Sequence, residues 1–122
     1  MIPREKRIKI WYLIRRSATK LGVADISDET KRDYWEYMKQ PNESIRYILI
    51  EHYNLDTGFF YHAYEESDLK GANEQTRLGE MYEHYFHDDS EGTNEELLLI
   101  DVKSMKAFTL RKEIKYTKKA IK

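Results

Sequence analysis

The sequence predicts a single α+β domain over residues 1–122, in which an antiparallel sheet of about four strands packs with two or three helices. Three observations predict it. Two β-type stretches flank a turn in the middle of the chain, amphipathic helical patterns lie before and after them, and a second pair of β-type stretches follows. The 122 residues fit one domain that is large enough to bury a core without disulfides, and the chain has no cysteine to form them.

The central β-type stretches are residues 45–53 and 59–65, which are rich in Ile, Tyr and Phe. The turn between them, residues 54–58, contains Asp56, whose side chain can bond to the backbone two residues on. It also contains Gly58, which accepts a positive φ without steric cost. These features predict a β-hairpin.

Pairing Tyr53 with Phe59 gives this hairpin two largely apolar faces, so we expect its sheet to be covered on both sides. One predicted face carries Tyr47, Leu49, Glu51, Tyr53, Phe59, Tyr61 and Ala63; the other carries Ile48, Ile50, His52, Phe60, His62 and Tyr64. The alternative is a helix over residues 43–55, because the apolar residues there also fit a helical stripe.

Three helices are predicted. Residues 4–20 form a basic amphipathic pattern, although the alternation at residues 7–10 also suits a strand. Ser27 can cap a second helix that ends before Pro41. Asn73 can cap a third helix over about residues 74–86, whose apolar stripe is Leu78, Met81, Tyr82, Tyr85 and Phe86.

The second pair of strands is predicted at residues 97–102 and 106–114, after a solvated loop at residues 87–96. Residues 116–122 are predicted to be a mobile basic tail.

Charge is strongly segregated along the chain. Residues 1–20 carry a net +6 and residues 103–122 a net +7, whereas residues 21–102 carry −14. The basic ends predict a candidate nucleic-acid contact set. Its members are Arg4, Lys6, Arg7, Lys9, Arg15, Arg16, Lys118 and Lys119. The alternative is that the basic ends neutralise the acidic middle of the same chain or of a second copy.

No catalytic, cofactor or metal motif is present. His84 and His87 are three residues apart beside Glu83, Asp88 and Asp89, and His52 and His62 lie on the two arms of the hairpin, but neither pair has a recognised ligand spacing. Residues 88–96 lack the order of a calcium loop, and no glycine-rich phosphate loop occurs. We therefore assign no catalytic residue, no metal ligand and no cofactor.

Residues 45–58 and the stretch K-A-F-T-L-R-K-E-I at residues 106–114 are faintly similar to the strands of Sm-like barrel regulators, the WYL domains. The similarity covers only these two short segments. The tripeptide Trp11-Tyr12-Leu13 lies outside them, so the resemblance assigns no family.

Ten tyrosines, segregated charge and the lack of a catalytic motif favour a non-enzymatic regulatory or inhibitory protein. We expect it to act through contacts with another protein or a second copy of itself. The first alternative is a small nucleic-acid-binding module that uses the basic ends, and the second is a metal-dependent nuclease. We expect no membrane association, because no apolar run approaches about 20 residues, and a cytoplasmic location, which the absence of cysteine also fits.

Overall fold

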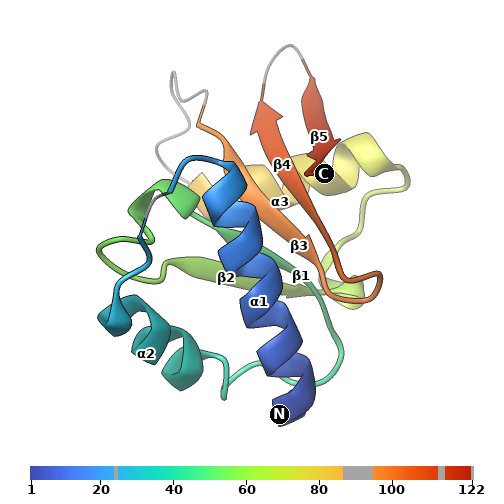
Figure 1. The fold of residues 1–122 in the computed structure, drawn as a ribbon. Coiled ribbons are helices and arrows are strands. Elements are labelled where there is room, and N and C mark those ends of the chain that lie inside the picture. The colour runs from blue at the N-terminus through green and yellow to red at the C-terminus, as the bar shows by residue number, and fades with distance from the viewer. Residues whose placement is uncertain (24, 87–94, 113–114, 122) are drawn as a thin grey trace.

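A computed structural model describes residues 1–23, 25–86, 95–112 and 115–121, and it shows the predicted small α+β domain (Figure 1). The helices are α1 (Arg4–Lys20), α2 (Asp28–Tyr37) and α3 (Glu74–Phe86). The strands are β1 (Ile45–Ile50), β2 (Tyr61–Glu65), β3 (Leu97–Asp101), β4 (Lys106–Lys112) and β5 (Tyr116–Ala120). The five strands form one antiparallel sheet in the order β2-β1-β3-β4-β5.

The sheet is covered on both faces, as the apolar character of its central strands predicts. Ile48, Ile50 and Ile100 pack on the face covered by α1 and α2, whereas Leu49 and Leu99 pack on the face covered by α3. Every residue of β3 is buried. The two central strands therefore join two separate cores into one domain. No helix in the described part of the chain is long and apolar enough to span a membrane.

The predicted hairpin is present, but its register differs from the prediction by one residue. Ile48 pairs with Ala63 and Ile50 pairs with Tyr61, so Tyr61 and Ala63 share the α1–α2 face with Ile48 and Ile50. The difference arises because β1 ends at Ile50 and the connection to β2 is longer than a five-residue turn. It contains a 3-10 turn at His52–Asn54 and the buried Leu55. A shift of one residue exchanges the two faces of a strand.

The helices begin where the sequence predicts. The side chain of Ser27 accepts a hydrogen bond from the Thr30 N–H at 3.1 Å. The side chain of Asn73 accepts one from the Thr76 N–H at 3.0 Å. Both contacts satisfy amide groups that have no partner within the first turn of a helix.

Residues 116–120 form the edge strand β5 rather than the mobile tail that the sequence predicts, which raises the strand count from about four to five. Tyr116 packs in the α3 core, and its ring lies directly over Gly79. A Cβ atom at Gly79 would lie 2.8 Å from Cε2 of Tyr116. Gly79 therefore allows α3 to approach β5 closely, at a cost of about 1 kcal/mol in helix propensity.

A partly buried ion pair holds the start of β1 to the end of β3. Arg46 donates to both carboxylate oxygens of Asp101, from Nε at 3.0 Å and from Nη2 at 3.2 Å. Asp101 also accepts from the backbone N–H groups of Lys103 and Ser104 in the turn that follows. Arg46 also forms an ion pair with Glu66, and Glu66 forms a second ion pair with Arg77 of α3. This series of ion pairs links the sheet to the helix.

This ion pair makes stability depend on pH. Burial raises the pKa of Asp101, but the hydrogen bonds from Arg46 and Ser104 outweigh burial and hold the pKa below its usual range. Because the folded pKa is the lower one, the stabilisation is complete above the unfolded value of about 3.9 and is lost as pH falls through the folded value.

We predict that Asp101→Asn lowers the free energy of unfolding by about 2 kcal/mol at pH 7, since Arg46 loses a charged acceptor. The gap between the variant and the wild type narrows as pH falls below about 4. Denaturant unfolding at a series of pH values checks this, with Asp56→Asn at an exposed position as the control. Equal stability of Asp101→Asn and wild type at pH 7 would contradict the role given to the pair.

Candidate functional site

The outer edge of β2 carries backbone groups that no strand in the described part of the chain uses. The Glu51 N–H donates to the Phe60 carbonyl at 3.2 Å, which fixes the alternation of the β1–β2 ladder. By this alternation His62 and Tyr64 direct their N–H and C=O groups towards β1, whereas Tyr61 and Ala63 direct theirs outwards. Within the described residues, no other backbone segment bonds to these outward groups. This stretch of β2 also contains no lysine and no proline, which commonly protect sheet edges.

The opposite edge of the sheet is protected. In β5 the outward-facing residues are Tyr116, Lys118 and Ala120, because Ile121 donates to Ala107 on the β4 side. The Gln75 side-chain amide of α3 bonds to both the N–H and the C=O of Tyr116. Lys118 occupies the next outward position of β5. The two edges therefore differ in kind: a helix and a lysine close one of them, and the other is open.

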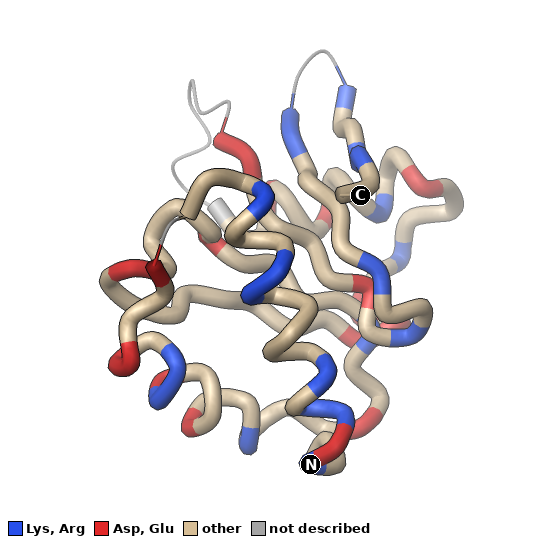
Figure 2. The backbone as a smooth tube through the Cα atoms, in the orientation of Figure 1, with Lys and Arg blue, Asp and Glu red and all other residues tan. Residues whose placement is uncertain are grey.

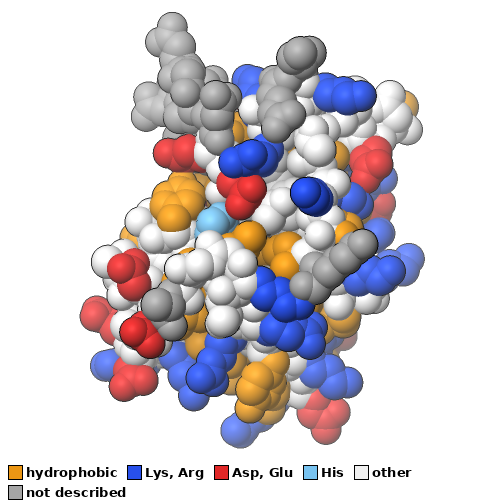
Figure 3. Space-filling view, turned by 45° about the horizontal axis from the view of Figure 1, so that its top comes forward, with side chains coloured by type: hydrophobic (Ala, Val, Ile, Leu, Met, Phe, Trp, Pro, Cys, Tyr) orange, Lys and Arg blue, Asp and Glu red, His pale blue; other side chains and the backbone are white. Residues whose placement is uncertain are grey.

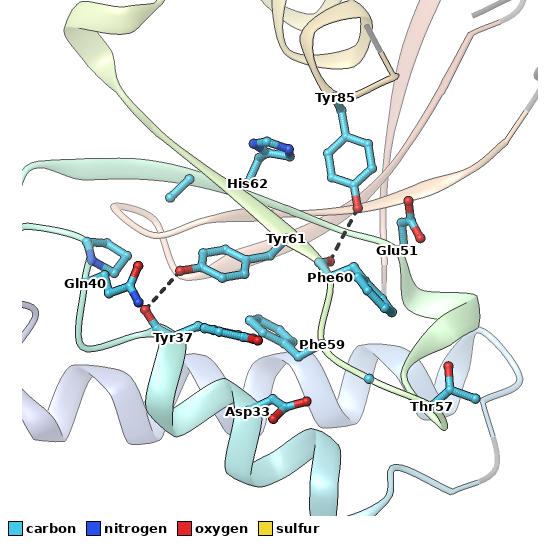
Figure 4. A pocket seen from close by; sticks show the side chains of 13 residues that line it. Asp33, Tyr37, Gln40, Glu51, Thr57, Phe59, Phe60, Tyr61, His62 and Tyr85 are labelled. Carbon is cyan, nitrogen blue, oxygen red and sulfur yellow. Dashed lines mark hydrogen bonds between the residues drawn. The ribbon is translucent and has the colours of Figure 1, made fainter. Parts of the chain in front are cut away.

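A groove of about 840 Å³ runs along the open edge (Figure 4). Tyr61, His62 and Ala63 of β2 line it, together with Tyr37 of α2 and Tyr85 of α3. Phe60, at the entrance to β2, is 53% exposed, and Tyr37 is 41% exposed. The two charged residues in the lining are Asp33 and Glu51, and the lining contains no lysine or arginine. The groove is thus aromatic and acidic.

Hydrogen bonds and ring contacts hold the aromatic side chains of the groove in place. The Tyr61 hydroxyl donates to the Tyr37 carbonyl at 3.0 Å, and the Tyr61 ring stacks on Phe59 with ring centroids 4.9 Å apart. The Tyr85 hydroxyl donates to the Phe60 carbonyl at 3.4 Å. Burial raises the pKa of Tyr85, and the negative charge of Glu51 raises it further. The hydroxyl groups therefore stay protonated and uncharged at neutral pH.

The basic residues of α1, which the sequence predicts as part of a nucleic-acid contact set, point in several directions. Lys9, Arg15 and Arg16 are exposed. Figure 2 marks lysine and arginine positions along α1, and Figure 3 shows basic side chains on the surface, interspersed with hydrophobic and acidic ones. Arg7 instead packs inwards, with Cζ 5.6 Å from the centre of the Trp35 ring. Among the described residues, no basic side chain of α1 forms an ion pair with a carboxylate.

The C-terminal members of that predicted set separate. Lys118 lies on the α3 face, where its Nζ is 3.0 Å from Glu74 and 4.2 Å from the centre of the Phe108 ring. Lys119 alternates with it and lies on the α1 face. The remaining members have separate surroundings: Arg4 is exposed at the first residue of α1, and Lys6 lines a hollow that also contains Lys103 and Arg46. The structure therefore brings together only part of the predicted set.

Three of the four histidines lie in described residues, and they are in two places. His52 is 8% exposed, with Nε2 3.6 Å from Glu96, and burial lowers its pKa against the opposing effect of that carboxylate. His62 and His84 face each other with ring centroids 5.3 Å apart. The described residues contain no group of three His, Asp or Glu side chains with metal-binding geometry. His87 and residues 88–94 lie outside the described part of the chain.

The groove residues were not singled out from the sequence as a site. Asp33, Glu51 and Tyr85 come from three separate elements and share no spacing along the chain. The sequence marks His62 as a possible ligand beside His52, but it does not connect His62 with the other groove residues. No protein-family model, curated protein or solved structure matches the chain. The groove is thus identified by its geometry alone.

Proposed function

We propose that this chain is a non-enzymatic regulatory or inhibitory protein that acts through protein–protein contacts, and that it binds an extended segment of its partner by strand addition to β2. We place this activity in the cytoplasm, in keeping with the cysteine-free composition. The observation that carries the proposal is the open edge of β2 at the base of an aromatic groove. An extended peptide bonds to such an edge through its backbone, while alternate side chains enter the pockets beside it.

The contrast between the two sheet edges supports this proposal. An exposed edge strand promotes aggregation, and folded proteins usually blunt it with lysine, proline or a covering element. The β5 edge has two of these protective features, the covering helix α3 and a lysine, Lys118. The β2 edge has none of them at Tyr61 and Ala63, and it is flanked by exposed aromatic side chains of the kind enriched at protein interfaces. Such an arrangement is typical of a binding edge.

We predict that Ala63→Pro weakens the binding of extended peptides at least tenfold. Proline removes the outward N–H of Ala63, whereas the β1–β2 ladder does not use that group. The test uses ten-residue peptides selected on the wild-type protein from a displayed random library. In a titration monitored by fluorescence anisotropy, these peptides are expected to bind Ala63→Pro at least tenfold more weakly than the wild type. The reason is that the partner strand loses one ladder hydrogen bond and steric access to the edge.

Lys118→Pro is the matched control, because it places proline at an outward position of the opposite edge. This variant is expected to bind the selected peptides as the wild type does, provided that circular dichroism shows all three proteins folded. Equal affinity of the wild type and Ala63→Pro for the selected peptides would refute strand addition at β2.

A second candidate function is nucleic-acid binding by α1. The specific observation in its favour is that the basic residues of α1 form no ion pairs with described carboxylates, whereas Arg111 and Lys112 pair with Glu96 and Glu83. Tyr12 is 62% exposed on the same helix, one turn from Lys9 and Arg16. Basic side chains around an exposed aromatic ring suit phosphates and stacked bases.

For this second function we predict that binding to DNA or RNA weakens steeply with salt, and that Arg15→Ala with Arg16→Ala lowers the salt slope by about 1.8, at roughly 0.9 per duplex phosphate contact. Mobility-shift titrations at two salt concentrations measure the slope. Arg111→Ala with Lys112→Ala removes the same charge from side chains that already have partners, and it is expected to change the slope less. An equal effect of the two double variants would show that α1 has no dedicated site.

A further inference from the structure

We propose that the β2 groove selects an extended segment with an arginine or lysine side chain at one defined position, and that Asp33 binds this cation. The inference rests on the proposed strand addition at β2 and names the chemistry of the partner. Asp33 and Tyr37 are four residues apart on α2 and therefore lie on one face of that helix. Both residues line the groove.

Asp33 is half-buried, and it forms no hydrogen bond or ion pair with any described residue. Figure 4 shows its side chain on α2, below the rings of Tyr37 and Phe59 in that view. Glu36, on the same helix but outside the groove lining, instead pairs with Lys39. A carboxylate in a partly enclosed site gains most from a cation, because fewer waters screen it there than at the surface.

The aromatic rings beside Asp33 also favour a cation. Tyr37 and Tyr61 have ring centroids 6.3 Å apart, and Tyr61 stacks on Phe59. The faces of aromatic rings attract the guanidinium of arginine and the ammonium of lysine. Their apolar stems can lie along the same rings. Carboxylate and rings together form a site for a long basic side chain.

The alternation of a strand fixes where this side chain stands in the partner. Tyr61 directs its side chain to the α1–α2 face, so the partner residue opposite Tyr61 also directs its side chain to that face, towards Tyr37 and Asp33. The partner residues before and after it point to the α3 face, towards His62 and Tyr85. The expected pattern is one basic residue flanked by uncharged residues.

A second copy of this chain fits the groove poorly if it pairs through the same edge. The sequence of β2, Y-H-A-Y-E, contains no lysine or arginine. A pair of β2 strands would therefore leave Asp33 of each copy without a cation and bring two acidic grooves together, which is unfavourable. Charge complementarity points instead to a basic segment of another protein.

The test uses a displayed library of random ten-residue peptides, selected separately on the wild type, Asp33→Asn, Asp33→Lys and the control Glu36→Gln. Arginine or lysine is expected to be enriched at one position on the wild type and on Glu36→Gln, but not on Asp33→Asn. The charge reversal Asp33→Lys is expected to enrich aspartate or glutamate there. Individual wild-type peptides are expected to bind Asp33→Asn about fivefold more weakly, and their Arg→Gln versions are expected not to distinguish the two proteins.

The outcomes separate this inference from the proposed function. Peptides that depend on the Ala63 edge but show no basic preference, or the same preference on Asp33→Asn, would overturn the role of Asp33 and leave strand addition standing. Failure of the wild type to select any peptide sensitive to Ala63→Pro would overturn both. Loss of binding in Asp33→Asn counts only with an unchanged melting temperature, and the altered preference of Asp33→Lys is an outcome that unfolding does not produce.

Discussion

The burial of β1 and β3 on both faces is the constraint on which the rest of the structure depends. Leu49 and Leu99 belong to one core, and Ile48 and Ile100 belong to the other, so neither helical layer can separate without exposing the centre of the sheet. The Arg46–Asp101 pair lies at one end of these two strands and fixes their register. Because the central strands are covered on both sides, the sheet meets solvent mainly at its edges. These edges differ, since Gln75 and Lys118 protect β5 whereas the outward groups of β2 are open.

The open edge and the basic helix present opposite charge to solvent. The groove beside β2 is lined by Asp33 and Glu51, whereas α1 exposes Lys9, Arg15 and Arg16. The segregation seen along the chain therefore persists partly in space, although Arg111, Lys112 and Lys118 pair with acidic residues. Although the net charge is near zero, the molecule has an acidic surface at the β2 groove and a basic surface on α1. The acidic surface suits a basic strand, and the basic surface suits a polyanion.

The sequence predicts the three helices and the central hairpin because local signals suffice for them: Ser27 and Asn73 cap their helices, and branched and aromatic residues mark the strands. The predicted register of the hairpin is wrong by one residue because Leu55 is buried by tertiary packing, which turn preferences of the local sequence do not reveal. The strand at residues 116–120 was missed because its lysines suggest a solvated tail. It is held by Tyr116 over Gly79 and by Gln75, contacts between elements about 40 residues apart. The groove was missed for the same reason, since no local pattern connects Asp33, Glu51 and Tyr85.

The central claim is that Tyr61 and Ala63 present free backbone groups at an accessible edge. Residue-resolved amide hydrogen exchange of the free protein, recorded by NMR at low concentration, tests it most directly. The account predicts an alternating pattern in β2, with fast exchange at Tyr61 and Ala63 and slow exchange at His62 and Tyr64, whose N–H groups bond to β1. Slow exchange at all four amides would mean that the edge is already covered, and fast exchange at His62 and Tyr64 with slow exchange at Tyr61 and Ala63 would mean that the register is wrong.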